Sequence, residues 1–558
     1  PYLFLNKKAQ VQYPDGSETS IEFPLNAKGS SVNESTFAKG FQTIRTDSRL
    51  GEIKIESSLN PNLIFFDFRK NQWAVEGKPV FWLGMTETTL LGNQPFRYSL
   101  SIQFTQSIKQ DMTVHPTWES DEEIIYTPTA RVPRHDPQYF IPEPKQWKFT
   151  GEDYPIGDNS LIWVKDPDNK DIKSSLDFLN QELSKYYGKT LPICRHNELP
   201  PWTMVITDKQ LINSIQLPEI QNHMEGYSLL TDTLAVRLKA NHPKGFFYGI
   251  TTLTQSNKID LVRCYYKGVA INDWPSLDFR GVHLFTGKDN PSEIKHMVRN
   301  VLARYKINTL IWECEYLVWD CHPELAHPEY AMTKKDAQQV IQTCQHNQVE
   351  IVPLVQSLGH SEWIFSNGYN LDLAEDPEHP YAYNPTNPKS YDFIFEVYRE
   401  ALDLFKPRYF HIGHDEVTTE GRFPWRSKDT GKSITELVLG DIEILYNWFK
   451  SHQVQIMMWF DMYIMRGEAP DATNAPSMEE ALYRRRKLPK DIIATDWHYA
   501  TVEPEKYSSI GILKKEGFPV IGAAWDQPGN IRNLALACIQ NKALGFIQTT
   551  WAGFTFSV

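Results

Sequence analysis

The sequence has little cysteine, no long hydrophobic run and fewer basic than acidic residues. Its six cysteines include no closely spaced metal-binding pair and are too few to form a disulfide framework for 558 residues. No apolar run approaches the ~20 residues that a membrane helix needs. The 57 Lys and Arg against 69 Asp and Glu give a net charge of -12, which argues against a nucleic-acid partner because phosphate contacts need a basic surface.

Apolar and aromatic residues are plentiful instead. Hydrophobic residues make up 41% of the chain and aromatic residues 13%, which excludes a disordered, collagen-like or coiled-coil protein. The chain begins at Pro1 with no Met and no signal-like segment, so we expect a processed or trimmed chain whose targeting cannot be read. Its compartment and oligomeric state are therefore not predicted.

Three segments differ in their residue pattern. Residues 1–138 contain short alternating runs broken by turns such as Pro14-Asp15-Gly16, which predicts a β-rich, sandwich-like N-terminal domain. Residues 139–270 combine helical spacing over Asp171–Tyr187 with strand-like runs, which predicts a small α+β domain. Residues 271–558 form the third segment, and the chain as a whole is predicted to be an α/β multidomain protein.

The third segment repeats a short apolar run followed by a loop and a helix-patterned stretch. Eight such units over roughly 280 residues match the ~250-residue norm of a (β/α)8 TIM barrel. An open doubly wound sheet is the alternative, but no glycine-rich phosphate loop follows an early strand. Only seven residues follow Trp551, so we expect an atypical last unit or a chain that ends early. The runs are Phe279–Phe285, Ile307–Glu315, Glu350–Gln356, Tyr409–Glu416, Gln455–Met462, Ile492–Tyr499, Val520–Gln527 and Gly545–Trp551.

Two adjacent carboxylates, Asp415 and Glu416, end the fourth predicted strand, where a TIM barrel places its chemistry. At a strand end both side chains can enter one pocket, and two close carboxylates push each other's titrations apart. Such a pair suits a proton donor with an electrostatic partner. The alternative is a solvent-exposed acidic turn, against which the preceding apolar strand and the flanking His411 and His414 argue.

Tryptophans end the last four predicted strands. Indole rings stack on the flat C–H faces of sugars, so this array indicates a carbohydrate subsite, although some of the rings could simply plug the barrel top. Arg280 lies on the first strand, and its planar guanidinium group can bind two hydroxyls or a carboxylate of a ligand. The alternative is a structural ion pair with Asp461 or Glu416. The basic run Arg484–Lys487 is expected on an exposed helix face. The four tryptophans are Trp459, Trp497, Trp525 and Trp551.

The segment His411-Ile412-Gly413-His414-Asp415-Glu416 resembles the H-x-G-x-D-E signature of glycoside hydrolase family 20, the β-N-acetylhexosaminidases. Ile141–Pro144 and Gly245–Gln255 resemble the opening and closing stretches of that family's non-catalytic α+β domain, and Trp274–Gly281 resembles the entry into its first barrel strand. The resemblance covers roughly residues 139–551. Further matches point to the branch that contains hexosaminidase D. They are Leu310–Tyr316 and Val352–His360.

The sequence departs from the family pattern at two places. The aspartate-bearing H-x-x-D-D segment that usually follows the second strand is missing, so the family's Asp–His pair does not map directly onto Glu315 and His360. Ala552-Gly553 stand where many members have a glutamate that holds the outer hydroxyls of the sugar. Asp461 or Asp526 is predicted to take that role.

The resemblance implies an exo-acting, retaining enzyme that removes terminal β-linked GlcNAc or GalNAc, with the 2-acetamido oxygen of the substrate as the nucleophile. Glu416 would be the general acid and base, and Asp415 would hold the acetamide N–H and stabilise the oxazolinium ion. Tyr499, or else Tyr463, would fix the acetamide oxygen. No protein nucleophile, metal or cofactor is needed. The predicted substrate-binding residues are Arg280, Glu315, His360, Trp459, Asp461, Tyr463, Trp497, Tyr499, Trp525, Asp526 and Trp551.

Two other functions remain open at this point. An O-GlcNAcase-like hydrolase shares the G-x-x-Y-G-type domain, but that family typically uses an Asp-Asp pair where this chain has Asp415-Glu416. A catalytically inactive, carbohydrate-binding barrel is hard to reconcile with both carboxylates being intact. The predicted partner is an oligosaccharide or glycoconjugate with a terminal β-GlcNAc or β-GalNAc, and the sequence does not choose between the two sugars.

Overall fold

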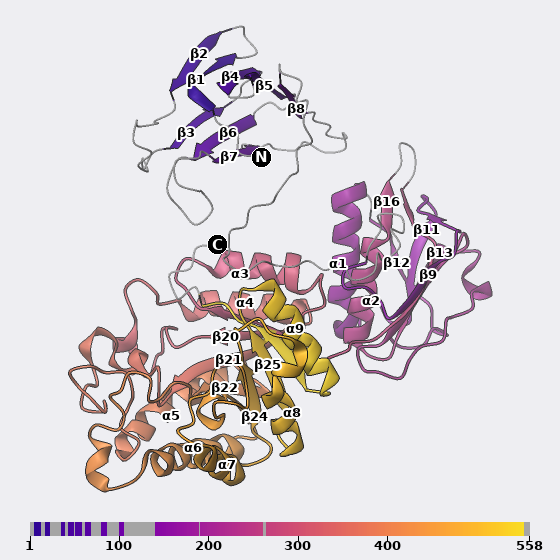
Figure 1. Ribbon diagram of the computed structural model, residues 1–558. Coiled ribbons are helices and arrows are strands. Elements are labelled where there is room, and N and C mark those ends of the chain that lie inside the picture. The colour runs from indigo at the N-terminus through magenta and orange to yellow at the C-terminus, as the bar shows by residue number, and fades with distance from the viewer. Residues whose placement is uncertain are drawn as a thin grey trace. The chain divides into compact units, whose positions relative to one another are not determined.

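The computed structural model divides the chain into two compact units, residues 1–135 and 136–558 (Figure 1). Each unit is described by itself below. The residues that the structure describes are 5–12, 17–22, 35–39, 43–48, 51–57, 62–67, 80–85, 100–104, 140–188, 190–259 and 264–551.

The first unit contains two antiparallel sheets in its described residues, which confirms the prediction of a β-rich N-terminal region. The larger sheet has the order β2-β1-β4-β5-β8 and the smaller one the order β3-β6-β7. Every strand pair in them is antiparallel, as expected for runs joined by tight turns. The strands are β1 (Leu5–Gln12), β2 (Glu18–Glu22), β3 (Ser35–Lys39), β4 (Thr43–Ser48), β5 (Gly51–Ser57), β6 (Asn62–Asp67), β7 (Val80–Met85) and β8 (Leu100–Phe104).

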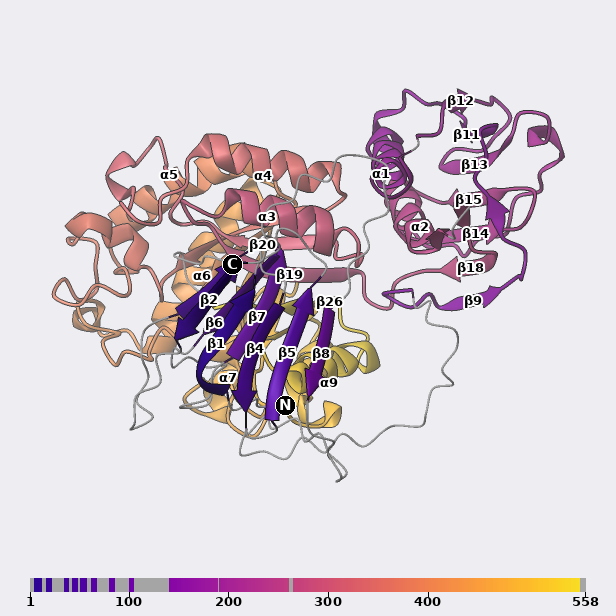
Figure 2. The same ribbon diagram turned by 90° about the horizontal axis from the view of Figure 1, so that it is seen from above.

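The second unit begins with an α+β region built on a seven-stranded sheet of order β12-β11-β13-β15-β14-β18-β9. Helices α1 (Lys170–Tyr187) and α2 (Pro243–Gln255) lie side by side on one face of this sheet (Figures 1 and 2) and share a hydrophobic core with it. Helix α1 ends at Gly188, which adopts a left-handed conformation with φ of 63°. The strands are β9 (Gln146–Phe149), β11 (Ser160–Val164), β12 (Ile193–Arg195), β13 (Thr203–Asp208), β14 (Tyr227–Thr231), β15 (Val236–Ala240) and β18 (Val269–Asp273).

A smaller sheet in this region has the order β10 (Tyr154–Pro155), β17 (Cys264–Tyr266) and β16 (Asn257–Ile259). Strand β18 crosses the boundary that the sequence suggests at residues 270 and 271, because it pairs with β14 as far as Asp273 and with β9 as far as Asn272. The division of this unit into residues 139–270 and 271–558 therefore stays a proposal.

The rest of the second unit is a closed barrel of eight parallel strands in sequence order, as the sequence predicts. Helices on the outside connect successive strands (Figure 1). The strands are β19 (Phe279–Phe285), β20 (Thr309–Glu313), β21 (Glu350–Ser357), β22 (Tyr409–Gly413), β23 (Gln455–Trp459), β24 (Ile493–Trp497), β25 (Val520–Ala524) and β26 (Gly545–Gln548). The helices are α3 (Pro291–Met297), α4 (Lys334–His346), α5 (Pro388–Phe405), α6 (Ile434–Ser451), α7 (Met478–Lys487), α8 (Ser508–Lys515) and α9 (Pro528–Gln540).

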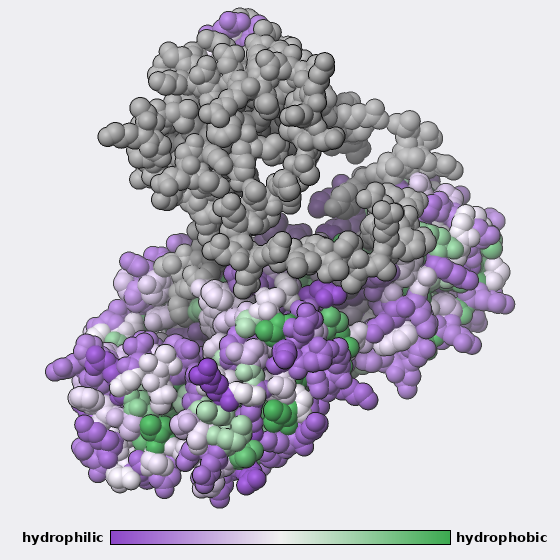
Figure 3. Space-filling view, viewed as in Figure 1, coloured by the Kyte–Doolittle hydropathy of each residue, from purple (hydrophilic) through white to green (hydrophobic). Residues whose placement is uncertain are grey.

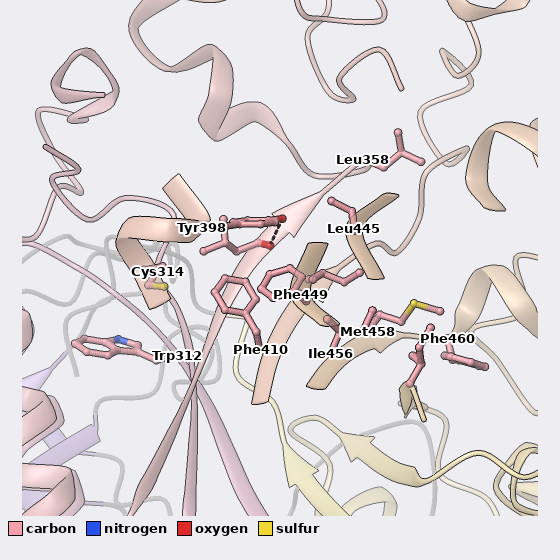
Figure 4. Close-up of a cluster of buried hydrophobic side chains, with 14 of the residues drawn as sticks. Trp312, Cys314, Leu358, Tyr398, Phe410, Leu445, Phe449, Ile456, Met458 and Phe460 are labelled. Carbon is pink, nitrogen blue, oxygen red and sulfur yellow. Dashed lines mark hydrogen bonds between the residues drawn. The ribbon is translucent and has the colours of Figure 1, made fainter. Parts of the chain in front are cut away.

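Side chains alternate along the barrel strands between two cores. One set, including Ile311, Leu354 and Trp459, fills the barrel interior. The other set packs between strands and helices; Figure 4 shows part of it, with Phe410 and Phe449 among the labelled rings. This alternation decides which strand residues can reach a site inside the barrel mouth, because neighbours on a strand face opposite ways.

On the face seen in Figure 3, the surface of the described residues is largely hydrophilic. Hydrophobic side chains form small, separate patches on the face seen in Figure 3. None of the helices in the described part of the chain is long and apolar enough to cross a membrane. The predicted exposed face over Arg484–Lys487 is wrong for two of its residues. Arg485 is buried in ion pairs with Glu468 and Glu516, and Arg484 is buried as well.

Candidate active site

A cavity of about 330 Å³ opens where the carboxyl ends of strands β19 to β22 and the chain after β26 come together. Four of its lining residues are among those predicted from sequence, and the cavity brings them together. Carboxyl, amide and imidazole groups dominate its polar surface. The lining residues are Phe285, Glu313, Glu315, Tyr316, Gln356, His360, Glu362, Trp363, Asp415 and Trp551.

The chain leaves strand β22 through an unusual backbone path. Gly413, His414 and Glu416 have φ values of 66°, 72° and 49°, so two residues with side chains adopt the left-handed region. Such conformations cost free energy and persist at sites where the surroundings fix them. Gly359 leaves room for this backbone path, because a Cβ atom at residue 359 would lie 2.4 Å from the carbonyl oxygen of Asp415.

Asp415 lies in the cavity wall and is only 7% exposed. Its Oδ1 atom has no hydrogen-bond partner among the described residues, and its Oδ2 atom lies 3.9 Å from Nε2 of His360. Burial raises the pKa of Asp415, and the neighbouring Asp461 and Glu416 act in the same direction. A desolvated carboxyl of this kind interacts strongly with an N–H donor or with positive charge that develops beside it.

Glu416 faces His360, with 3.2 Å between Oε2 and Nε2. Burial alone would lower the pKa of His360, but the charge of Asp415 and the hydrogen bond to Glu416 outweigh it and raise the pKa to about 10. The imidazole is therefore cationic near neutral pH and can hold both carboxyl groups in place. The distances suit a pair of carboxyl groups with separate roles on one small ligand.

The backbone of Glu416 is held from both sides. Its N–H donates to Oδ2 of Asp461 at 3.1 Å, and its carbonyl oxygen accepts from the hydroxyl of Tyr381 at 3.1 Å. Asp461 also accepts from Nδ2 of Asn474 at 2.8 Å and from Nε1 of Trp497 at 3.3 Å. These bonds account for the left-handed conformation at Glu416, because they fix both of its peptide groups.

The prediction that Asp461 binds sugar hydroxyls is therefore corrected. Asp461 is 1% exposed, and both of its carboxyl oxygens accept hydrogen bonds from the protein. Its geometry is that of a residue that positions Glu416. Asp526, the other candidate for hydroxyl binding, is exposed and accepts a bond from the neighbouring Gln527, outside the lining of the cavity.

Replacing Tyr381 by Phe is expected to lower kcat about tenfold with little change in KM, because one hydrogen bond that aims Glu416 is lost. Steady-state kinetics on an aryl β-GlcNAc would measure the two constants. Tyr398→Phe is the matched control, since the Tyr398 hydroxyl donates to the carbonyl oxygen of Val355, away from Glu416. Equal effects of both substitutions on kcat would contradict the positioning role.

Four predicted aromatic side chains gather near the carboxyl pair. Nε1 of Trp551 donates to the hydroxyl of Tyr499 at 2.7 Å, and the Tyr499 ring lies 4.9 Å from Trp497 and 5.4 Å from Trp525. Burial raises the pKa of Tyr499, and the charges of Asp415 and Glu416 add to this effect. The hydroxyl of Tyr499 therefore stays neutral and keeps a proton that it can donate. Trp525 is 37% exposed and stands at the rim.

Trp459 lies deeper inside the barrel than the sequence predicts. It is fully buried in the barrel interior, where its ring lies 4.4 Å from His411 and 5.8 Å from Trp551. It supports Trp551 from below and does not line the cavity. A role in the floor of the site fits this position better than a role in the wall.

An ion pair beneath Tyr499 fixes the chain after strand β24. Asp471 accepts from the N–H groups of Tyr499 and Ala500, both at 2.7 Å, and from Nδ1 of His498 at 2.8 Å. His498 is fully buried and also lies 3.2 Å from Asp496. Burial alone would lower the pKa of His498, but Asp496 and Asp471 raise it to about 9.

The stability of the barrel is expected to depend on the protonation of His498. The folded-state pKa of His498, about 9, exceeds the unfolded value of 6.5. The contribution of His498 to the free energy of unfolding is therefore complete below pH 6.5 and is lost as pH rises through about 9. Denaturant unfolding at several pH values would measure it. His498→Gln should remove the fall in the free energy of unfolding between pH 6.5 and 9. An unchanged slope in this range would show that His498 is not the group responsible.

Arg280 does not reach the site, and that prediction is wrong. It is the second residue of strand β19, so it lies at the amino end of the barrel, opposite the cavity. There it pairs with Glu225 at 2.6 Å and donates to the carbonyl oxygens of Leu277 and Lys306. It serves the junction between the barrel and the α+β region, because Glu225 belongs to the latter.

Tyr463 is also placed elsewhere. It is fully buried against Phe460 in the layer between strands and helices, which excludes it from holding a ligand in the cavity. Tyr499 is left as the candidate for the acetamide oxygen. Glu315, by contrast, lines the cavity as predicted, with Oε1 accepting from the N–H of Gln356 at 2.9 Å.

Sequence reasoning missed several residues of the site. Gln356 and Glu362 line the cavity, while Tyr381 and Asn474 hold the catalytic backbone and its partner. Gln356 ends the third predicted strand, so the strand-end rule could have found it. Tyr381 and Asn474 come from long loops, where no periodic pattern marks them.

Among the described residues, no group of three or more His, Cys, Asp or Glu side chains is arranged to hold a metal ion. The arrangement instead offers a carboxyl pair, a cationic imidazole and a neutral tyrosine hydroxyl around one small cavity. Such a set can donate a proton, accept one and stabilise a developing positive charge.

Family models match most of the second unit. The model "Glycosyl hydrolase family 20, domain 2" matches residues 138–274, and "Glycosyl hydrolase family 20, catalytic domain" matches residues 278–524. Curated relatives are distant. Beta-hexosaminidase subunit A2 of Dictyostelium discoideum is 24% identical over 319 residues, which cover 53% of this chain and 56% of that protein. Beta-hexosaminidase of Vibrio furnissii is 27% identical over 235 residues, which cover 34% and 37%.

The chain spans about half the length, or less, of these curated relatives. Hexosaminidase D of Bos taurus is 24% identical over 151 residues, covering 26% of this chain and 43% of that protein, so the branch stays a proposal. Among solved structures, an inactive mutant of an exo beta-N-acetylglucosaminidase from Vibrio harveyi has a TM-score of 0.57 at 17% identity, covering 99% and 86% of the two chains. A chitobiase from Flavobacterium johnsoniae has a TM-score of 0.56 at 19% identity, covering 74% and 65%. These likenesses show the fold alone.

Proposed function

The chain belongs to glycoside hydrolase family 20, and from this premise we propose that it is an exo-acting, retaining β-N-acetylhexosaminidase that removes terminal β-linked GlcNAc or GalNAc. The observation that carries the proposal is that Asp415 and His360 line one cavity and that Glu416 lies 3.2 Å from His360. The charges of Asp415 and Glu416 also act on the hydroxyl of Tyr499. The substrate would be an oligosaccharide or glycoconjugate. The terminal sugar would enter the cavity at the barrel mouth.

Glu416 would protonate the glycosidic oxygen as the bond to the aglycone breaks. His360, 3.2 Å away, would keep the carboxyl group in position until the substrate arrives. In the second step Glu416 would deprotonate the water that attacks the anomeric carbon. The bond from that carbon to the acetamide oxygen then breaks, and Glu416 is left protonated as at the start. The hydrogen bonds of the Glu416 backbone with Asp461 and Tyr381 would keep the Glu416 carboxyl group pointing the same way through both steps.

The nucleophile would be the acetamide oxygen of the substrate. It attacks the anomeric carbon while the bond to the leaving oxygen breaks, and the ring that forms carries a positive charge over its nitrogen and oxygen. Asp415 would accept the acetamide N–H through its unpaired oxygen and stabilise that charge, and Tyr499 would donate to the acetamide oxygen. Trp551 would cover the acetamide methyl group.

Initial rates on matched aryl β-GlcNAc, β-GalNAc and β-glucose substrates test this proposal. We expect turnover of the acetamido sugars and a loss of at least ~1,000-fold on the glucoside, which lacks the internal nucleophile. Comparable rates on all three substrates would contradict acetamide participation. Binding of the acetamido sugars without any turnover would favour an inactive, carbohydrate-binding barrel.

A further inference from the structure

A second cavity, here called the junction cavity, lies where the α+β region meets the amino end of the barrel. Its lining combines residues of the α+β region, such as Tyr227 and Tyr248, with barrel residues such as Arg280 and Lys306. It shares no lining residue with the catalytic cavity. Its volume of about 320 Å³ nearly equals the 330 Å³ of the catalytic cavity, so both cavities have room for a ligand of the same size.

Two ion pairs among the lining residues of the junction cavity compensate each other's charge. Nζ of Lys306 lies 2.9 Å from Oδ2 of Asp273, and both side chains are buried. Nη2 of Arg280 lies 2.6 Å from Oε2 of Glu225, which is buried as well. Since each buried charge already has its partner, neither an anion nor a cation finds an uncompensated charge here. The junction cavity therefore favours a neutral, polar ligand.

Two polar groups of the junction cavity keep hydrogen-bonding capacity for such a ligand. Tyr248 is 2% exposed, and its hydroxyl has no hydrogen-bond partner in the part of the chain that the structure describes. The ammonium group of Lys306 donates to the hydroxyl of Tyr227 at 2.8 Å and to Asp273 at 2.9 Å, which accounts for two of its three N–H groups. Buried polar groups left open are costly unless a ligand or water pairs with them.

The charged groups around these two positions are held in place by other bonds. Oε1 of Glu225 accepts from Nδ2 of Asn308 at 3.0 Å, and Oδ1 of Asp273 accepts from the N–H of Lys145 at 3.0 Å. Arg280 donates to three backbone carbonyl oxygens besides its ion pair. A ligand of the junction cavity therefore meets a preorganised polar surface, which lowers the entropic cost of binding.

The remaining walls of the junction cavity are apolar and partly aromatic. Trp274, Pro275 and Leu277 line it beside Ile307, and the exposed ring of Tyr305 also contributes. A sugar ring matches this combination, because its C–H faces pack on aromatic and aliphatic walls while its hydroxyl groups donate and accept hydrogen bonds. A wholly apolar ligand would leave the open polar groups unpaired.

We propose that the junction cavity is a second carbohydrate-binding site, which takes one neutral sugar unit through the Tyr248 hydroxyl and the Lys306 ammonium group. The site lies at the amino end of the barrel, whereas Asp415 and Glu416 follow the carboxyl end of strand β22. A sugar bound there takes no part in bond cleavage and instead holds a glycan on the enzyme. Such binding does not depend on turnover in the catalytic cavity, so it stands apart from the proposed activity.

Titration of the full chain with methyl β-GlcNAc, followed by ligand-observed NMR, tests the proposal. The catalytic cavity is first saturated with a thiazoline that mimics the oxazolinium ion, and we expect one saturable sugar site to remain. Ser276→Trp, which fills the cavity from an exposed lining position, should weaken that site at least ~10-fold, and Tyr248→Phe about fivefold. Ser184→Trp, on the exposed side of helix α1 and outside the cavity lining, is the matched control and should leave the affinity unchanged.

Charged glycosides test the compensated charges of the junction cavity. The anionic methyl β-glucuronide and the cationic methyl β-glucosaminide should each bind at least about fivefold more weakly than the neutral sugar, because both ion pairs are already closed. Tighter binding of either charged glycoside would contradict a site for neutral sugars.

The absence of sugar binding in the thiazoline-saturated wild type would overturn the proposal, and so would binding that survives both substitutions unchanged. Tyr248→Phe removes a hydroxyl that has no partner in the described part of the chain, so it supplies the answer if Ser276→Trp fails to fold. A thiazoline that does not bind at all would refute the proposed function instead. The difference in methyl β-GlcNAc affinity between wild type and the two variants would then still decide whether the junction cavity binds sugar.

Discussion

Glu416→Gln is expected to lower kcat on an aryl β-GlcNAc by at least ~1,000-fold, because the amide can neither protonate the leaving oxygen nor deprotonate water. The side-chain shape is kept, so binding of the sugar should change little. The hydrogen bond to His360 has an equivalent acceptor in the amide oxygen, and the backbone bonds to Asp461 and Tyr381 are untouched. Steady-state kinetics would separate the fall in kcat from KM.

The leaving group supplies the internal control for this variant. A dinitrophenyl glycoside needs little protonation, so its first step should be affected far less than that of a simple alkyl or sugar aglycone. Glu362→Gln, in the same cavity wall, should keep most of the activity on both substrates because no step uses it. Near-native turnover by Glu416→Gln on the unactivated substrate would show that another group is the acid.

Asp415→Asn is expected to weaken an oxazoline-like thiazoline inhibitor by at least ~100-fold, while the affinity for GlcNAc falls less than about tenfold. The inhibitor resembles the charged intermediate, and the buried carboxylate of Asp415 stabilises that charge at close range without competing water. Free GlcNAc carries no such charge, so it loses only one hydrogen bond. Inhibition constants and direct titration would give the two numbers.

The ratio of the two losses is the informative quantity. A thiazoline that loses no more affinity than GlcNAc would mean that Asp415 only binds the sugar. Burial raises the pKa of Asp415, and the neighbouring Asp461 and Glu416 act in the same direction. The positive charge of the intermediate should therefore favour the ionised form of Asp415. Inhibitor affinity for the wild type should therefore rise with pH through that pKa, and Asp415→Asn should remove this dependence.

Much of the barrel could be predicted from sequence because each strand is a short apolar run with a polar residue at its end. The observed strands β19 to β26 lie within the eight predicted runs, apart from one extra residue at the end of β21. The rule that chemistry collects at the carboxyl ends predicted Asp415, Glu416, Glu315 and Trp551 in the site region. It failed for Arg280, because the residue stands second in its strand and so belongs to the opposite end.

Roles within the site depended on contacts that no local pattern reveals. Asp461 follows the end of strand β23, as a hydroxyl binder would, yet its carboxyl oxygens accept hydrogen bonds from Asn474 and Trp497. Tyr463 follows closely after Asp461, but a turn of 3-10 helix directs it into the outer core. Arg485 is buried because Glu468 and Glu516 neutralise it across long sequence distances. Pairing of this kind is a property of the folded chain.

Substrate participation is tested most directly by the nucleophilicity of the acetamide itself. The kcat/KM of the wild type is measured on aryl glucosaminides whose N-acyl group is acetyl, fluoroacetyl, difluoroacetyl or trifluoroacetyl. Each fluorine withdraws electron density from the carbonyl oxygen, so we predict a steep, continuous fall of at least ~100-fold across the series. A change of less than about threefold would contradict the account, because a nucleophile supplied by the protein would be indifferent to the substitution.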